Sequence, residues 1–233
     1  MQAQTQTQTQ PLTLGPSHSK HIVLFAAGGG GDPERHRPFL EHLAAQGIQV
    51  IAPRFEHLIA REASPAELLA RPIGLIEALH QWAAPDAEIV AVGHSIGGWA
   101  ALCLAGATPW GRDGKPMEVP REPRIGRLVL FAPASGWFAA PGALDQVTAP
   151  MLVFAGERDA VTPVGQISCL TKAPPPVDLR VVPKAGHFSF MNTPPPNAVE
   201  DEDEAFDREA FLGDLARATA EFVLARQRPG SGS

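Results

Sequence analysis

The chain has 233 residues, which is long enough for one well-buried α/β domain and short for two. Hydrophobic residues make up 44% of it and charged residues 19%, while the formal net charge of −6 argues against a nucleic-acid or anionic-membrane partner. No apolar run approaches the ~18 residues of a membrane span. The two cysteines, Cys103 and Cys169, lie in apolar helical patterns and are predicted to be buried side chains rather than a disulfide or metal ligands.

Three parts of the chain differ in composition. Residues 1–19 open with a Gln/Thr repeat and are expected to be a disordered leader, since they lack the basic start and apolar centre of a signal peptide. Residues 20–227 are expected to form one α/β domain, and residues 228–233 a flexible tail. Without a signal peptide or a membrane span, we expect a cytoplasmic protein.

Short apolar runs alternate with helical patterns along this domain. The runs are continuous rather than alternating in polarity, as expected for strands that are buried on both faces of a parallel sheet. They are His21–Ala27, Ile48–Ala52, Glu88–Val92, Arg127–Ala132, Met151–Ala155 and Asp178–Val182. This alternation predicts a doubly wound, mostly parallel α/β sheet of roughly six to eight strands.

The predicted helices have readable start signals. They begin at Asp32-Pro33, Ser64-Pro65, Thr162-Pro163 and about Phe206, and the last one ends near Ala225. Arg71-Pro72 is expected to break the second helix, with a separate helix running on to Trp82. Two stretches are predicted to be loops: 108–123, and 191–204, whose acidic run Glu200–Glu204 is interpreted as a solvated entry to the last helix.

The sharpest motif follows the run Glu88–Val92. Gly93-His-Ser-Ile-Gly97 is a Gly-x-Ser-x-Gly sequence, and a helix of small residues comes after it. A serine on such a strand-to-helix turn is held in a strained conformation with its hydroxyl above the sheet. We predict that Ser95 is a nucleophile, the alternative being a glycine-rich turn with a structural serine. His94 is expected to pack beside the turn, since a ring next to the nucleophile cannot easily face its hydroxyl.

A serine nucleophile needs a general base, and the base needs an orienting acid. On this kind of sheet the chain order is Ser, acid, His, each after a strand. Asp159 follows Met151–Ala155, and His187 follows Asp178–Val182. We therefore predict Asp159 as the acid and His187 as the base. Glu157 is the rival acid, which we rank second because Asp159 lies further into the loop.

The oxyanion formed during acyl transfer needs backbone N–H donors. One is expected at Ile96, where the helix after the serine presents its positive end. The other is expected in the glycines 28–31, which follow the first strong strand. Four glycines could also form a phosphate-binding loop, but the Lys-Ser/Thr ending and the spaced glycine pattern of such loops are absent. We predict Gly29 as the donor, with Gly28 as the neighbouring alternative and a substrate contact.

Three segments, Gly93–Gly98, Ala155–Asp159 and Lys184–Phe190, resemble the α/β-hydrolase superfamily. Within it, the chain from about Lys20 to Ala225 is similar to the group of predicted dienelactone hydrolases, which also resembles platelet-activating-factor acetylhydrolases and polyester hydrolases. The resemblance implies a sheet of about eight strands, a small-molecule carboxylic-ester substrate, and no cofactor or metal. Ser95 stands where true dienelactone hydrolases have a cysteine, which puts that specific reaction in doubt. Ala27-Gly28 replaces the usual His-Gly before the oxyanion loop.

Several apolar side chains flank the predicted catalytic loops. Trp137, Phe138 and Phe188 are predicted to line the substrate site, although a core position is the alternative for such residues, above all for Trp99. Lids in the superfamily occupy the segment corresponding to Pro133–Pro150, whose about 18 residues are too few for a separate cap domain. We therefore expect an open site with Trp137 and Phe138 as one wall.

Three functions compete at this stage. The first is hydrolysis of carboxylic esters, with short-chain or exposed esters preferred. The second keeps the same serine chemistry in a thioesterase or a small amidase. The third is a non-catalytic, hydrolase-like binding protein, which would require a damaged triad that the sequence does not show.

Overall fold

The apolar runs form a seven-stranded sheet in the computed structural model, which describes residues 10–225. The strands are β1 (Leu12–Leu14), β2 (His21–Ala26), β3 (Gln49–Ala52), β4 (Glu88–His94), β5 (Ile125–Phe131), β6 (Met151–Gly156) and β7 (Val177–Val182). Their order across the sheet is β1-β3-β2-β4-β5-β6-β7, and every neighbouring pair is parallel except β1 and β3. The predicted mostly parallel sheet is confirmed.

The strand β1 corrects the predicted leader. Leu12 to Leu14 pair with Ala52 to Val50 in antiparallel register, so this part of residues 1–19 belongs to the sheet. The side chain of Leu12 is buried in the core, which gives the short strand an apolar anchor. The Gln/Thr repeat at residues 1–9 and the predicted tail at 228–233 lie outside the described residues.

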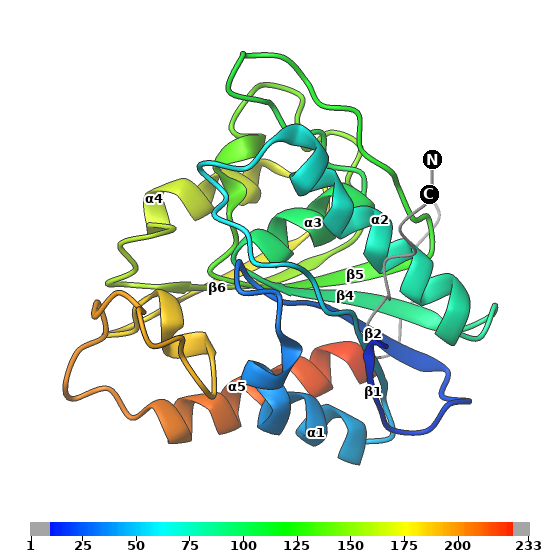
Figure 1. Ribbon diagram of the computed structural model, residues 1–233. Coiled ribbons are helices and arrows are strands. Elements are labelled where there is room, and N and C mark those ends of the chain that lie inside the picture. Colours follow the sequence, from blue (N-terminus) through cyan, green and yellow to red (C-terminus); the bar gives the residue numbers. More distant parts are fainter. Residues whose placement is uncertain (1–9, 226–233) are drawn as a thin grey trace, which may run out of the picture.

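Helices cover both faces of the sheet, as Figure 1 shows. They are α1 (Arg37–Ala45), α2 (Pro65–Trp82), α3 (Ile96–Leu104), α4 (Val164–Ile167) and α5 (Arg208–Leu224), with short 3₁₀ helices η1 (Pro33–His36), η2 (Ser135–Phe138), η3 (Ser168–Lys172) and η4 (His187–Phe190). The helices α1 and α5 pack together on one face, and α2 and α3 lie on the other. This arrangement is the doubly wound layering that the strand–helix alternation predicts.

The second helix does not break at Pro72, so that prediction is wrong. Ser64 caps α2 through a capping box with Glu67, and the helix continues through Pro72 to Trp82. An interior proline removes one backbone hydrogen bond and costs about 3 kcal/mol. Burial of Leu68, Pro72 and Leu75 against the sheet offsets that loss.

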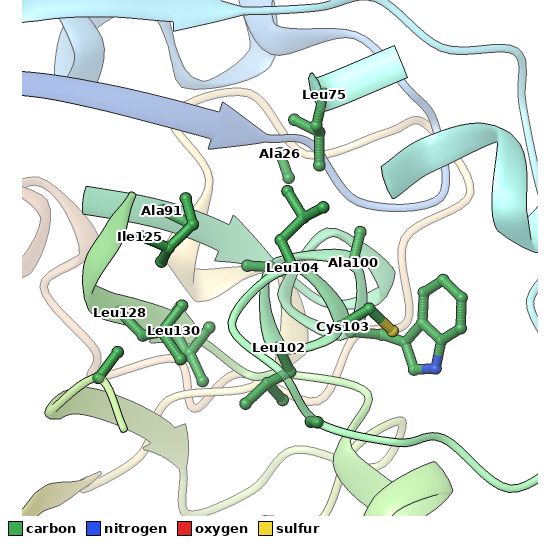
Figure 2. Packing of buried hydrophobic residues seen from close by; sticks show 14 of the residues in the cluster. Ala26, Leu75, Ala91, Ala100, Leu102, Cys103, Leu104, Ile125, Leu128 and Leu130 are labelled. Carbon is green, nitrogen blue, oxygen red and sulfur yellow. The ribbon is translucent and has the colours of Figure 1, made fainter. Parts of the chain in front are cut away.

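The core consists of two apolar layers, one on each face of the sheet. Figure 2 shows the layer under α2 and α3, where side chains from the helices meet those of β2, β4 and β5. Trp99 on α3 is fully buried there, and Cys103 is buried beside it, whereas Cys169 is half-buried; both cysteines are free. No helix among residues 10–225 is long and apolar enough to cross a membrane.

The segment after β5 is short, as predicted. Residues 133–150 contain the helix η2 and a series of turns, and they form no separate cap domain over the sheet. The loop 108–123 folds back on itself through one bridge between Trp110 and Pro116. The carboxyl ends of the parallel strands are therefore left uncovered by a second domain, and the loops at that edge define the candidate site.

Candidate active site

Ser95 stands on a strained turn between β4 and α3. Its backbone has φ 55° and ψ −122°, a left-handed conformation that L-residues avoid. The turn is tight enough to exclude side chains at both flanking glycines. A Cβ on Gly93 would lie 2.5 Å from the carbonyl oxygen of Gly97, and one on Gly97 would lie 2.0 Å from that of Ala26. The predicted serine elbow is therefore present in the fold.

The structure brings Ser95, His187 and Asp159 together from the ends of β4, β7 and β6. Nε2 of His187 lies 3.0 Å from the Ser95 hydroxyl oxygen, and Nδ1 lies 2.9 Å from Asp159 Oδ2. An ionised carboxylate only accepts hydrogen bonds, so Nδ1 carries the proton and Nε2 is free to accept the serine proton. This arrangement can generate a serine nucleophile at neutral pH.

Asp159 is held as a buried carboxylate. Its Oδ1 accepts hydrogen bonds from the backbone N–H groups of Val161 and Thr162, at 2.8 and 2.6 Å, and the Thr162 hydroxyl lies 2.8 Å from Oδ2. Burial raises the pKa of the Asp159 carboxyl. The hydrogen bond and charge of His187, together with the hydrogen bonds of Thr162, lower it by more than burial raises it, so the pKa lies below its ordinary value. The group is therefore ionised at neutral pH.

Glu157 does not compete for this position. Its side chain is exposed and accepts a hydrogen bond from the backbone N–H of Lys184 at 2.9 Å. His94 also lies where the sequence predicts, packed behind the elbow, with Nε2 3.1 Å from the carbonyl oxygen of His187. Neither residue contacts the Ser95 hydroxyl in any hydrogen bond of the described chain.

The acidic run corrects a second prediction, because part of it braces the histidine loop instead of facing only solvent. The Asp201 carboxylate accepts hydrogen bonds from the backbone N–H groups of His187, at 3.1 and 3.2 Å, and of Ala160, at 2.9 Å. Glu202 accepts a hydrogen bond from the hydroxyl of Ser189. Asp201 thus connects the loop after β6 to the loop after β7, a role that no sequence motif predicts.

Backbone donors for an oxyanion are available next to Ser95. Within the described residues, neither the Gly29 N–H nor the Ile96 N–H has a protein acceptor. Both residues line the cavity that contains Ser95. Gly28 lies against the elbow, since a Cβ there would be 3.5 Å from the Ser95 Cβ. Among residues 10–225, the N–H groups of Gly28 and Gly30 also have no protein acceptor, so the loop offers a short series of donors.

A cavity of about 450 Å³ opens beside Ser95. The predicted residues Gly28, Gly29, Ile96 and Phe188 line it, together with His187. Its other walls combine apolar and polar side chains, among them Leu58, Ile59, Val161, Met191, Pro195, Pro196, Asp32, Arg35 and His57. The size and the apolar walls suit a small organic molecule.

The prediction that Trp137 and Phe138 form a wall of this cavity is wrong. The side chain of Phe138 is 1% exposed and belongs to the core under α2 and α3. Trp137 packs edge-on against Trp99, with ring centroids 6.2 Å apart. The helix η2 therefore turns both rings toward the core, and segment 57–60, which the sequence did not single out, supplies the wall instead.

Two further histidines are buried behind the elbow. His36 lies with its ring centroid 5.4 Å from that of His94, which in turn lies 5.1 Å from that of His187. Burial lowers the pKa of His36 to about 3, and burial together with the charges of His187 and His36 lowers the pKa of His94 well below its ordinary value. Both rings are neutral at neutral pH.

Acid should therefore destabilise the fold well above the range in which carboxylates titrate. A histidine in the unfolded chain binds a proton near pH 6.5, whereas folded His36 does so only near pH 3. Between these values the unfolded state binds more protons than the folded state. As the pH is lowered, the free energy of unfolding therefore falls by up to about 1.4 kcal/mol per pH unit for each such histidine. The measurement is urea unfolding of wild type and His36→Met at several values between pH 7 and pH 5.

The variant tests whether His36 causes the slope. Methionine cannot titrate, so His36→Met should flatten the pH dependence by an amount that grows below pH 6.5 to about 1.4 kcal/mol per pH unit near pH 5. His18→Met is the control, because it makes the same substitution at an exposed histidine. Equal slopes in wild type and His36→Met would show that the buried ring does not resist protonation.

The sheet order, the helices on both faces and the serine turn at the end of β4 define the α/β-hydrolase fold, as the sequence predicts. The chain is similar in structure to a thermophilic esterase of the planctomycete Thermogutta terrifontis with bound propionate, with a TM-score of 0.64 and 19% identity over 92% of this chain and 88% of the esterase. The same esterase phosphoramylated by tabun gives a TM-score of 0.62 and 20% identity, over 91% and 87%.

A dienelactone hydrolase from Anabaena variabilis is also similar, with a TM-score of 0.64 and 22% identity over 93% of this chain and 91% of that protein. The sequence matches no protein-family model and no curated protein. At these identities the likeness establishes the fold, and the chemistry has to be argued from the residues at the site.

Proposed function

We propose that the protein is a serine hydrolase that cleaves carboxylic esters, with Ser95 as nucleophile, His187 as general base and Asp159 as the acid that orients it. The observation that carries the proposal is the continuous hydrogen-bonded chain from the Ser95 hydroxyl through the His187 ring to the Asp159 carboxylate. The strained backbone of Ser95 supports it, because strain at a nucleophile is characteristic of functional turns.

In the proposed reaction, the Ser95 oxygen attacks the ester carbonyl carbon while His187 Nε2 takes the serine proton. The tetrahedral intermediate carries its negative charge on the former carbonyl oxygen, which the N–H groups of Gly29 and Ile96 stabilise. The carbon–oxygen bond to the alcohol then breaks, and His187 returns the proton to the departing alcohol. Water attacks the resulting acyl-enzyme by the same steps and releases the acid.

The structural neighbours support ester substrates. The Thermogutta esterase binds propionate and butyrate in its structures, and it forms adducts with the organophosphates tabun and paraoxon. A thioesterase or a small amidase is the alternative with the same catalytic chain, and a non-catalytic binding protein is the third possibility. The apolar cavity beside Ser95 fits an acyl or alcohol group in each case, so substrate assays decide among them.

We expect kcat/KM to be highest for short acyl chains. The cavity of about 450 Å³ has no cap domain over it, and an open site buries few of the methylenes of a long chain, each worth about 0.8 kcal/mol when fully buried. The measurement is kcat/KM for nitrophenyl acetate, butyrate, octanoate and palmitate, with butyryl thioester and butyryl anilide alongside.

The panel also separates the candidate functions. Maximal activity on acetate or butyrate esters supports the proposal, and faster cleavage of the thioester or anilide indicates the second function. A steady rise toward palmitate would mean that a long apolar tunnel exists. If no compound is turned over, the non-catalytic binding protein would be the remaining function.

A further inference from the structure

Arg71 on α2 is a buried arginine that forms no ion pair within residues 10–225. Its side chain is 2% exposed. The guanidinium donates hydrogen bonds to the backbone carbonyls of Ala27 at 3.0 Å, Gly29 at 3.2 Å and Glu56 at 3.4 Å, and it lies over the Phe55 ring. Burial lowers the pKa of Arg71 to about 10, which still leaves the group charged at neutral pH.

Burying a charge without a carboxylate partner is costly for the fold. The neighbouring core positions of the same helix, Leu68 and Leu75, are apolar, so the environment of α2 does not itself require a charged side chain. What distinguishes Arg71 is its set of acceptors. Two of the three carbonyls belong to the glycine loop 28–31 and to the residue just before it.

These two contacts fix the peptides that carry the Gly28 and Gly30 N–H groups, on either side of the peptide that carries the Gly29 N–H. A trans peptide is planar, so its N–H points opposite to its C=O. Arg71 holds the carbonyls of Ala27 and Gly29, while the Gly31 N–H holds the carbonyl of Gly28 at 3.0 Å. The carbonyls of consecutive peptides are therefore all bonded. The Gly29 N–H belongs to the middle peptide, between the two that Arg71 holds.

The loop's own hydrogen bond, from the Gly31 N–H to the Gly28 carbonyl, leaves the carbonyls of Ala27 and Gly29 to be held from outside. Ala27 and the four glycines after it have no polar side-chain atom, and glycines have the largest backbone freedom to lose. Outside help comes from segment 55–58, where Phe55 and Leu58 donate to the carbonyls of Gly31 and Gly29. Arg71 joins this segment to the loop, since one of its nitrogens donates to carbonyls of both.

We propose that Arg71 is the positioning residue of the oxyanion hole, which holds loop 27–31 so that the Gly29 N–H is directed at the oxyanion. This inference rests on the proposed serine hydrolysis. Donors that are fixed in advance stabilise a transition state without reorganisation, and losing one donor costs about 100- to 1,000-fold in rate. Loss of Arg71 should act in the same way, through the direction of the donor.

Arg127 on β5 offers a matched control. It is also buried, at 6% exposure, and also lies over a phenylalanine ring, that of Phe222. Its guanidinium donates to backbone carbonyls of Phe222, Val223 and Ala225 at the end of α5. Arg71→Met and Arg127→Met therefore remove the same group from similar surroundings, one beside the candidate site and one at a helix end that does not line its cavity.

The test compares kcat and KM for nitrophenyl butyrate, together with the affinity for a phenylboronic acid, which forms a tetrahedral adduct with a serine. Arg71→Met should lower kcat by about 100-fold with KM changed by less than about 3-fold. Boronate affinity should fall with kcat, and binding of the product butyrate should stay the same. Arg127→Met should keep kcat while losing thermal stability. Arg71→Lys, which presents a charge but fewer donors, should lie between wild type and Arg71→Met.

Each outcome bears on the inference. An active wild type with normal kcat and boronate affinity in Arg71→Met would overturn it, as would equal losses of kcat in Arg71→Met and Arg127→Met. If Arg71→Met does not fold, Arg71→Lys carries the comparison, and an unchanged kcat in that variant would count against the proposal. A wild-type protein that neither hydrolyses esters nor binds the boronate would overturn the proposed function, and the inference with it.

Discussion

Replacing Ser95 by alanine is expected to lower kcat for ester hydrolysis by about six orders of magnitude, to the level of background reaction. The reason is that no other hydroxyl lies within hydrogen-bond reach of His187 Nε2 in the described chain. The fold should survive, because the Ser95 side chain makes one hydrogen bond and packs in no core cluster, a change of about 1 kcal/mol. The measurements are kcat for nitrophenyl butyrate and the free energy of unfolding in urea.

Ser135→Ala is a matched control for this experiment. Ser135 is a buried serine on η2 whose hydroxyl donates to the carbonyl of Gln166 at 3.2 Å, and it does not line the cavity. It should lose about 1 kcal/mol of stability and keep its activity. Paraoxon should transfer its diethylphosphoryl group to the serine, with release of nitrophenolate, and the mass of that group should appear on wild type and Ser135→Ala but not on Ser95→Ala. Ester turnover by purified Ser95→Ala would exclude the proposed mechanism.

The strands in the middle of the sheet could be predicted because burial on both faces requires continuous apolar runs. The strand β1 could not, since Leu12–Leu14 offers three residues with a threonine in the middle, too few to show a period. Its pairing with β3 depends on a contact that is distant in the sequence. The same limit applies to α2, where packing against the sheet overrides the local cost of Pro72.

The positions of Ser95, Asp159 and His187 could be predicted because loops that follow parallel strands meet at one edge of a sheet. The end of a strand and the type of residue that follows it can both be inferred from a short stretch of sequence. The direction of a ring cannot be inferred locally, and for this reason the sequence predicts Phe138 in the cavity although its side chain turns into the core. Tertiary packing decides which side of η2 faces inward.

The residues that brace the site carried no sequence signal at all. Arg71 reaches the carbonyl of Ala27 across 44 residues, and Asp201 reaches the backbone of His187 across 14. Both act on backbone groups, which have no side-chain pattern that a sequence could show. Asp201 moreover sits in an acidic run whose composition is typical of a solvated segment. Only the folded chain identifies such residues.

The second large effect is expected for Asp159→Asn, which should lower kcat by about three to four orders of magnitude. The backbone N–H groups of Val161 and Thr162 donate to Oδ1 of Asp159. An asparagine must keep its oxygen toward these donors, so its NH₂ group faces His187 Nδ1. That nitrogen must then accept a hydrogen bond, which moves the ring proton to Nε2 and prevents it from taking the Ser95 proton.

Glu157→Gln is the control for the acid, because Glu157 is two residues away and exposed, and its carboxylate accepts a hydrogen bond from the backbone N–H of Lys184 rather than from His187. It should change kcat by less than about 3-fold. Binding of a boronate should persist in Asp159→Asn if Ser95 and the loop 27–31 are intact, so that the loss lies in proton transfer rather than in binding. The measurements are kcat and KM of both variants on nitrophenyl butyrate across pH 6 to 9. A large loss in Glu157→Gln together with near-normal turnover in Asp159→Asn would transfer the role of the acid to Glu157.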